Sequence, residues 1–378
     1  MTDHFNAGMH PGIKKNIIAA GLLLAVISLA GELSYPIVGT GQNGTPSGKY
    51  RDNQGKTVSD LQTGLMWVKS RGKRVTYQQA ISGAAACCVG GYSDWRMPTI
   101  KELYSLILFS GVNGRANQGG KGYVPFIDQK FFEFVYGDPA DDLRLIDSQD
   151  WTADENKASG GRLVYGVNFA DGRIKSYPKF KRRERKDNLL YVRYVRGNSA
   201  YGVNRFKANG EQTVSDLATG LMWNRSDSKT GMDYPAAKKY VETLNQQKYL
   251  GYQDWRIPTA KELQSIVDYR RSPDVTKSPA IDPIFKTSGI TNEGGKKDYP
   301  YFWTSSQLNV DGRSPEQIYI AFGRALGFMR NQWVDIHGAG AQRSDPPTGD
   351  PAQFKNGRGP QGDAVRIRNY VRVVRTMP

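Results

Sequence analysis

The sequence Gly-Tyr-Gln-Asp-Trp-Arg-Ile-Pro-Thr-Ala-Lys-Glu-Leu occupies residues 251–263, and a near copy, Gly-Tyr-Ser-Asp-Trp-Arg-Met-Pro-Thr-Ile-Lys-Glu-Leu, occupies residues 91–103. Each copy ends in a Thr-x-x-Glu element, which is typical of a capping box at the start of a helix. The proline before each threonine favours an extended backbone at that point. We therefore expect a strand in each copy whose tryptophan anchors the following helix to a sheet. Apolar residues continue on one face of each predicted helix, through 106–108 and 266–267.

The glutamates of this motif, Glu102 and Glu262, have two candidate roles. A glutamate in a fixed motif can be a general acid, but at the third position of a helix it usually accepts from the N-cap backbone N–H. We favour capping. For Arg96 and Arg256 we favour ion pairing over ligand contact. The residues for which we expect structural roles in the repeated motifs are Asp60, Trp67, Asp94, Trp95, Arg96, Thr99, Glu102, Asp216, Trp223, Asp254, Trp255, Arg256, Thr259 and Glu262.

Other landmarks also occur twice and in the same order. Thr-Val-Ser-Asp-Leu-x-Thr-Gly-Leu-Met-Trp at 57–67 and 213–223 predicts a hairpin whose aspartate caps the turn. Predicted helices at 77–88 and 234–247 follow, and after the central motif come a Trp-Thr pair and alternating strands at 163–169 and 317–322. Asp171-Gly172 is expected to form a turn. Basic strands at 191–196 and 370–375 close the copies, which differ mainly in late insertions at 179–186 and 338–362.

The length of 378 residues indicates about two domains, and the repeats place them at 49–198 and 199–378. We expect the two copies to fold alike, each with its own sheet. Residues 31–48, rich in glycine and proline, are interpreted as a linker or an extended arm. Residues 1–30 carry two lysines before a short apolar run and resemble a secretory signal peptide, with an uncleaved anchor as the alternative. The expected location is therefore periplasmic, cell-surface or secreted, in a bacterium, with no stable membrane span after cleavage.

Charge and cysteine content narrow the function classes. Removal of residues 1–30 lowers the formal net charge only from +16 to +15, which favours polyanionic partners, although a basic surface that serves solubility is the alternative. The two cysteines, Cys87 and Cys88, are adjacent and cannot form a disulfide framework. A strained vicinal disulfide, an intermolecular bridge and two buried thiols are all compatible with the sequence, and we favour buried thiols.

The combination of Asp-Leu-x-Thr-Gly-Leu-Met-Trp, Asp-Trp-Arg-x-Pro-Thr-x-x-Glu-Leu, Trp-Thr and a final Val-Arg-x-Val-Arg strand resembles the Lcl C-terminal domain family over nearly all of residues 49–378. The motifs are also similar to those of formylglycine-generating-enzyme and C-type-lectin-like folds. The resemblance implies an α+β protein of two tandem C-type-lectin-like domains, each with two helices flanking twisted antiparallel strands. It also implies export and, by similarity to the adhesin that names the family, binding of sulfated glycosaminoglycans. Many members pair a cysteine of the first helix with one in the final strand, but Tyr194 and Val373 stand at the strand positions here.

Catalytic and metal-binding patterns are weak. A mature chain would keep one histidine, His337, which gives poor support for a Ser-His-Asp triad. Zinc motifs of the HExxH or CxxC type do not occur in the sequence, so we expect no metal, cofactor or enzymatic activity. The aspartates between 138 and 150 offer only a weak calcium alternative.

The candidate ligand-binding residues are the cations of the first late insertion, Lys179, Lys181, Arg182, Arg183, Arg185 and Lys186. Lysine and arginine bind sulfate and phosphate groups, although a solvated charged loop is the simpler interpretation. We therefore expect an adhesin-like binding module for an anionic glycan, or a structural component with envelope protein partners. Nucleic acid is not expected as a partner, because export removes most contact with it. The sequence leaves the oligomeric state open.

Overall fold

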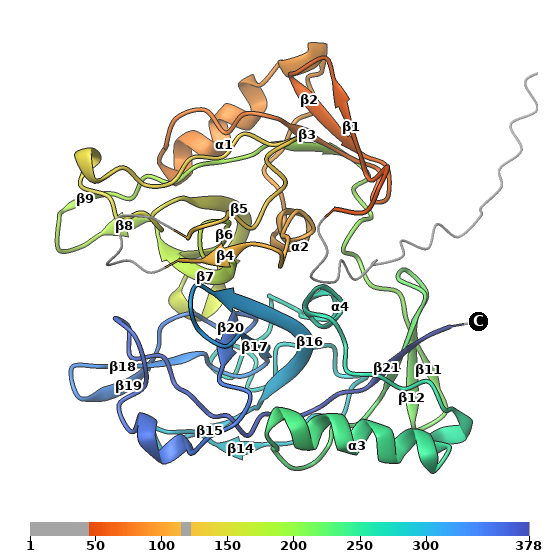
Figure 1. Ribbon diagram of the computed structural model, residues 1–378. Coiled ribbons are helices and arrows are strands. Elements are labelled where there is room, and N and C mark those ends of the chain that lie inside the picture. The colour runs from red at the N-terminus through yellow and green to blue at the C-terminus, as the bar shows by residue number, and fades with distance from the viewer. Residues whose placement is uncertain (1–44, 115–121, 378) are drawn as a thin grey trace, which may run out of the picture. The chain divides into compact units, whose positions relative to one another are not determined.

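The structure, a computed structural model, describes residues 45–114 and 122–377 (Figure 1). The expected signal peptide, the anchor alternative and most of the expected linker lie outside the described residues. We call residues 49–198 repeat one and residues 199–377 repeat two.

Each repeat opens with an antiparallel meander whose free edge is completed by the last strand of the same repeat. The sheet orders are β1-β2-β3-β10 and β11-β12-β13-β21. The strands are β1 (Tyr50–Asn53), β2 (Thr57–Asp60), β3 (Leu65–Val68), β10 (Val195–Gly197), β11 (Phe206–Asn209), β12 (Thr213–Asp216), β13 (Leu221–Asn224) and β21 (Val374–Thr376). The beginning and the end of each repeat are therefore hydrogen-bonded to each other.

The predicted hairpins are confirmed, and both turns are closed by the aspartate. Asp60 Oδ1 accepts from the backbone N–H groups of Gln62 and Thr63, at 3.0 and 3.2 Å. Asp216 Oδ1 accepts from the backbone of Ala218 at 3.1 Å. Gly64 follows in the left-handed conformation with φ 72°, which glycine adopts without steric cost.

Two helices follow in each repeat, and they are shorter than the sequence predicts. Their bounds are α1 (Tyr77–Ala86), α2 (Ile100–Tyr104), α3 (Tyr234–Gln246) and α4 (Ala260–Ser265), with 3₁₀ turns η1 (Val89–Gly91) and η5 (Tyr249–Gly251) between them. The first helix ends at Ala86 because Cys87 is extended. Residues 106–108 and 266–267, predicted on helical faces, are buried in the turns that follow α2 and α4 instead. Their burial, rather than helical structure, explains why they are apolar.

A seven-stranded sheet has the order β4-β16-β17-β20-β7-β6-β5 and takes strands from both repeats. Its members are β4 (Val112–Asn113), β5 (Gln149–Asn156), β6 (Leu163–Asn168), β7 (Arg173–Pro178), β16 (Tyr301–Val310), β17 (Glu316–Ala321) and β20 (Gln342–Asp345). The expectation of a separate sheet in each copy is wrong. The inner strands β7 and β20 pair antiparallel, and β4 of repeat one pairs with β16 of repeat two, so strand edges that would otherwise be open are covered.

The register across this sheet relates the two repeats by an approximate two-fold. Gly166 and Tyr319 are equivalent, because they pair with the equivalent tryptophans Trp151 and Trp303. Gly166 in turn pairs with Lys175, and Tyr319 pairs with Arg343. Lys175 and Arg343 are therefore equivalent, and so are their neighbours Ile174 and Gln342, which form the one pair that joins β7 to β20.

Helices α2 and α4 pack against each other on one face of this sheet, and their contacts follow the same approximate two-fold (Figure 1). Lys101 Nζ donates to the backbone carbonyl of Ser265 at 2.6 Å, and Lys261 Nζ donates to the backbone carbonyl of Ser105 at 2.9 Å. Burial lowers the pKa of Lys101 to about 8 and that of Lys261 well below its usual value. The two repeats thus share one core, which includes both helices and the sheet.

Repeat two carries two insertions where one was predicted. In repeat one a short turn at Asp171-Gly172 joins β6 to β7, as predicted, whereas the hairpin of β18 (Leu326–Met329) and β19 (Gln332–Asp335) separates β17 from β20. The predicted insertion at 338–362 therefore begins too early, because its first residues include the polar strand β20, which belongs to the large sheet. The insertion proper follows β20 and contains η6 (Pro351–Phe354).

The remaining elements are small hairpins and 3₁₀ turns. They are β8 (Phe180–Lys181) with β9 (Lys186–Asp187), β14 (Ile290–Thr291) with β15 (Lys297–Asp298), η3 (Pro139–Asp141) and η4 (Lys157–Ser159). The predicted closing strands are shortened, since residues 191 and 370 form only isolated parallel bridges. The described chain is mostly β with few helices, arranged in several sheets. None of its helices has the length and apolar character needed to cross a membrane.

Candidate functional site

The repeated central motif is a scaffold, because its polar side chains bond to one another. Arg96 donates two hydrogen bonds to Glu102, at 2.7 and 2.5 Å, and Arg256 donates two to Glu262, both at 2.7 Å. Each glutamate also accepts from the backbone N–H of its N-cap, Thr99 or Thr259, at 2.8 Å. The capping prediction is confirmed, and neither carboxylate is free to act as a general acid.

The other motif residues fix the closing strand of each repeat. Asp94 pairs with Arg196 at 2.6 Å, and Asp254 pairs with Arg375 at 2.7 Å. Both arginines also lie over a tyrosine ring, at 3.8 and 4.0 Å from the centroid. The motif tryptophans are buried, as predicted: Trp67, Trp95, Trp223 and Trp255. These contacts are the same in both repeats, which marks them as structural.

Two buried arginines that the sequence analysis did not single out perform a further structural task. Arg193 donates to the backbone carbonyls of Val68 and Glu133, at 2.9 and 2.7 Å, and its equivalent Arg372 donates to those of Asn224 and Lys286, both at 3.1 Å. Burial lowers the pKa of Arg193 to about 9 and that of Arg372 to about 10. Part of the high positive charge is therefore internal.

The predicted basic run folds as the β8–β9 hairpin, and the structure divides its cations into two groups. Lys179 is held by Glu155 and lies over the ring of Tyr77. Lys181 and Lys186 both pair with Glu184. The turn residues Arg182, Arg183 and Arg185 are exposed and have no ion pair with any residue in 45–114 or 122–377. Those three arginines are the free cations of the predicted site.

The hairpin borders a cleft of about 1160 Å³ that residues of both repeats line. Eight basic and five acidic side chains line it, so its net charge is positive. The basic ones are Arg74, Arg144, Arg173, Lys175, Lys181, Arg313, Arg343 and Arg358, and the acidic ones are Asp142, Asp147, Asp171, Glu316 and Asp363. We call this the cationic cleft.

The floor of the cationic cleft is formed around the two-fold-related residues Lys175 and Arg343. Their neighbours Ile174 and Gln342 face the opposite side of the sheet, where Gln342 accepts from Tyr104 of α2. Asp171, which is buried, pairs with Lys175 at 2.9 Å and with Arg173 at 3.3 Å. Asp363 pairs with Arg343. Three cations thus gather around two carboxylates.

Several donors at this floor have no hydrogen-bond partner among the described residues. They are Nε and Nη1 of Arg343, Nε of Arg173 and the hydroxyl of Tyr177. The pKa of Lys175 is lowered to about 8, because burial and the charges of Arg343 and Arg173 outweigh the attraction of Asp171. Burial and Arg173 likewise lower the pKa of Arg343 to about 10. An added anion in the cleft would relieve this repulsion.

His337 lies beside the floor but does not form a serine-activating arrangement. Its Nε2 is 2.7 Å from Asp363 Oδ1, while the hydroxyl of Ser176 donates to the backbone carbonyl of His337, at 2.8 Å. Burial and the charge of Arg343 hold the pKa of His337 well below its usual value. A neutral imidazole therefore donates to Asp363, which also holds Arg343.

The cysteine and calcium alternatives also have structural outcomes. Cys87 and Cys88 are free thiols, half-buried and exposed respectively, so the interpretation as two buried thiols is wrong. Among the candidate calcium ligands, Asp138 caps η3, Asp147 pairs with Arg144 and Asp150 pairs with Arg71. The described residues contain no group of three or more side chains suited to a metal ion.

The floor cations were missed because their grouping depends on strand pairing. Arg173 and Lys175 alternate on β7, which is a detectable signal, but Arg343 lies far along the sequence in a segment that was interpreted as a loop. The family model of the Lcl C-terminal domain matches residues 56–196 and 212–335. A search of curated proteins finds no match to the chain. The matched segments contain every motif described above except the closing strand of repeat two.

Proposed function

Because the chain belongs to the Lcl C-terminal domain family, we propose that it is an exported, non-catalytic binding protein that holds polyanionic glycan chains along the cationic cleft. The observation that carries the proposal is the floor of the cleft, where Lys175 lies with Arg173 and Arg343, two arginines that have unpartnered donors, beside two carboxylates. Sulfate and carboxylate groups match the planar donors of arginine.

The β8–β9 hairpin extends this site. Its arginines Arg182, Arg183 and Arg185 are exposed, and Lys181 at its base lines the cleft. A chain molecule with charges at regular intervals can contact the hairpin and the floor together, whereas a single small anion contacts only one of them. We therefore favour a glycan polymer. Export, which rests on residues 1–30, makes a nucleic acid the less suitable polyanion.

The proposal includes a C-type-lectin-like fold for each repeat. The pairing of β3 with β10 and of β13 with β21 supports it, because such folds bring their chain ends together. The proposal also assigns the binding surface to the late segments of the repeats, because the two repeats differ there.

Titration of the mature protein (residues 31–378) with a heparin oligosaccharide tests the proposal. We expect replacement of Arg182, Arg183 and Arg185 by glutamine to weaken binding about tenfold, which corresponds to about 1.4 kcal/mol. A matched control replaces Lys56, Lys207 and Lys239, which are also exposed, by glutamine. The control loses the same charge elsewhere, so a change of less than about twofold is expected.

A second variant tests the floor of the cleft directly. Arg343→Gln removes the charge and the two unpartnered donors of Arg343, and its fold is checked by thermal unfolding before heparin binding is measured. Equal affinities for the native protein, the hairpin variant and a folded Arg343→Gln protein would refute the proposal. Purification in a stoichiometric complex with an envelope protein, without any glycan affinity, would instead support the structural alternative.

A further inference from the structure

Repeat two contains a groove that the cationic cleft does not include and that has no counterpart among the predicted sites. Its volume is about 590 Å³, and it lies between the β14–β15 hairpin, β19, η6 and the segment before β21. Much of this lining comes from residues 351–370, which lie outside the segments matched by the family model. We call it the aromatic groove. Its size falls in the range of sites that bind small molecules.

Trp333 forms one wall of the aromatic groove and is exceptional among the tryptophans of the chain. The sequence has seven tryptophans, and the other six are buried. Trp333 is half-buried, and its ring contacts Phe328 with centroids 5.2 Å apart. The Cβ of Trp333 also packs against the β14–β15 turn, because a Cβ added to Gly294 in that turn would lie 3.3 Å from it. The indole is therefore fixed in place and still accessible.

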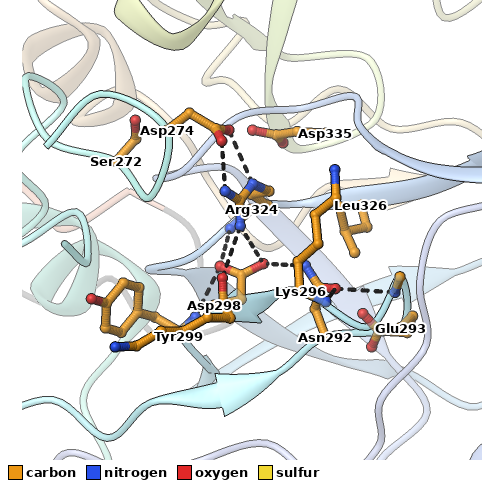
Figure 2. A network of polar contacts seen from close by, with 12 residues as sticks. Ser272, Asp274, Asn292, Glu293, Lys296, Asp298, Tyr299, Arg324, Leu326 and Asp335 are labelled. Carbon is orange, nitrogen blue, oxygen red and sulfur yellow. Dashed lines mark hydrogen bonds and ion pairs between the residues drawn. The ribbon is translucent and has the colours of Figure 1, made fainter. Parts of the chain in front are cut away.

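Arg366 forms the next part of the lining, and a polar network behind the groove holds it. Glu293 accepts two hydrogen bonds from Arg366, at 2.7 and 3.0 Å, and the guanidinium lies 3.6 Å from the ring centroid of Tyr301. Figure 2 shows the residues that order the turn around Glu293. There Asn292 donates to the buried Asp298 at 2.7 Å, and Asp298 accepts from the backbone of Arg324 at 3.0 Å.

The backbone beside Arg366 is strained. Ile367 has a φ of 58°, a conformation that is unfavourable for a β-branched residue. Asp345 stabilises it by accepting from the backbone N–H groups of Arg366 and Ile367, both at 3.0 Å, and from the amide of Asn369 at 3.1 Å. Strained backbone is concentrated at ligand sites, because surrounding contacts must maintain it.

Polar groups without protein partners complete the lining. Arg368 and Lys355 are exposed and form no ion pair with the described residues. The carboxamide oxygen of Asn369, a fully buried side chain in the groove, also has no partner among those residues. At the equivalent position of repeat one stands Leu190, as the matching bridges Val75–Leu190 and Met232–Asn369 show. Repeat two thus has a buried polar group where repeat one has an apolar one.

We propose that the aromatic groove binds a carboxylate-bearing sugar ring, whose face stacks on Trp333 and whose carboxylate pairs with Arg368. A sugar offers an apolar ring face and hydroxyl donors, which fit an indole and the carboxamide oxygen of Asn369. The lining contains three basic side chains, Lys355, Arg366 and Arg368, and one acidic side chain, Glu293. The net positive charge of the groove is therefore complementary to a negatively charged ligand. The site is independent of the cationic cleft, although Val365 lines both.

Tryptophan fluorescence tests the proposal, because six of the seven indoles are buried and Trp333 is the accessible one. The probe is tetragalacturonate, which carries carboxylates and no sulfate, added to the full mature protein with and without acrylamide as quencher. We expect the probe to protect Trp333 from quenching. Arg368→Gln should weaken binding about tenfold, whereas Arg51→Gln, an exposed control in repeat one, should leave it unchanged.

Calorimetry of Trp333→Ala and Trp333→Phe separates stacking from folding. We expect loss of binding in Trp333→Ala and partial retention in Trp333→Phe, which keeps an aromatic face. No protection of the native protein at millimolar probe would overturn the proposal. An equal response to tetraglutamate would overturn the sugar assignment in favour of an acidic peptide. The hairpin variant with glutamine at 182, 183 and 185 should bind tetragalacturonate normally, so failure here and failure of heparin binding are distinguishable.

Discussion

Repeat one and repeat two share the contacts of their meanders, capped helices and closing strands, but they differ in the segments that are inserted before and after the third strand of each half of the large sheet. The Arg-Glu forks, the buried tryptophans and the buried arginines Arg193 and Arg372 occur in both. After β7, repeat one forms a hairpin with three unpaired arginines, whereas in repeat two the β14–β15 hairpin, β19 and the segment after β20 form the aromatic groove. Contacts that are the same in both repeats therefore maintain the fold, and the exposed hairpin arginines and the aromatic groove lie where the repeats differ.

A second difference concerns buried carboxylates. Burial would raise the pKa of Asp171, but Lys175 and Arg173 offset this, so the pKa is lowered. In repeat two, Asp335 has no ion pair with a cation in residues 45–114 or 122–377, and burial raises its pKa to about 7. Its Oδ1 accepts from the backbone N–H groups of Ala325 and Gly338, at 3.1 and 2.9 Å. Asp171 is thus charged near neutral pH, whereas Asp335 is partly protonated.

The largest expected effect comes from Trp67→Ala and Trp223→Ala, which test whether the repeats are energetically one body. Both side chains are fully buried in the shared core. Each change should lower the free energy of unfolding by about 3–5 kcal/mol. Because the core and a sheet are shared, urea denaturation should show one transition that shifts in both variants. Leu61→Ala, at an exposed site, serves as the control; two separate transitions would show independent domains.

The next effect sharpens the comparison of the carboxylates. For Asp335, the folded pKa is raised, so its stabilising effect is complete below the unfolded pKa near 4 and is lost as the pH rises to about 7. Asp335→Asn keeps the acceptor and does not titrate. Relative to the native protein, it should therefore gain about 4 kcal/mol between pH 4 and pH 8 in urea denaturation.

Asp171→Asn should show the opposite sign. The folded pKa of Asp171 is lowered, so its contribution is present above the unfolded pKa and is lost as the pH falls through the folded pKa. Its removal leaves Lys175 and Arg173 without their carboxylate, and we expect a loss of about 3 kcal/mol at pH 7 that diminishes in acid. Parallel pH profiles for the two variants would contradict the assignment of opposite charge states.

The smallest effect concerns the shared scaffold. Glu102→Gln and Glu262→Gln keep an acceptor for the N-cap but weaken the bonds from Arg96 and Arg256. Each variant should lose about 1 kcal/mol of unfolding free energy, by similar amounts in both repeats. Heparin affinity should stay at the native value. A large loss of affinity with unchanged stability would instead assign a binding role to the motif.

Much of the scaffold was predictable because its contacts are local in sequence. The turn capped by Asp60 and the box of Thr99 with Glu102 each join residues within a few positions. The shared sheet was not predictable in this way, since the pair of Ile174 and Gln342 joins strands of different repeats and β20 is polar in sequence. The floor cation Arg343 was missed for the same reason, whereas the exposed hairpin arginines were predicted from composition alone.

The sequence by itself determined the duplication, the capped turns and helices, the buried tryptophans and the basic run, because these depend on residue type and short spacing. Only the tertiary structure decided that the repeats share one sheet, that Lys175 and Arg343 meet at its centre, and that Trp333 stays half-buried in a groove while the other six tryptophans are buried. The physical reason is that strand pairing and burial bring together residues far apart in the chain, and no local pattern specifies which edges will join.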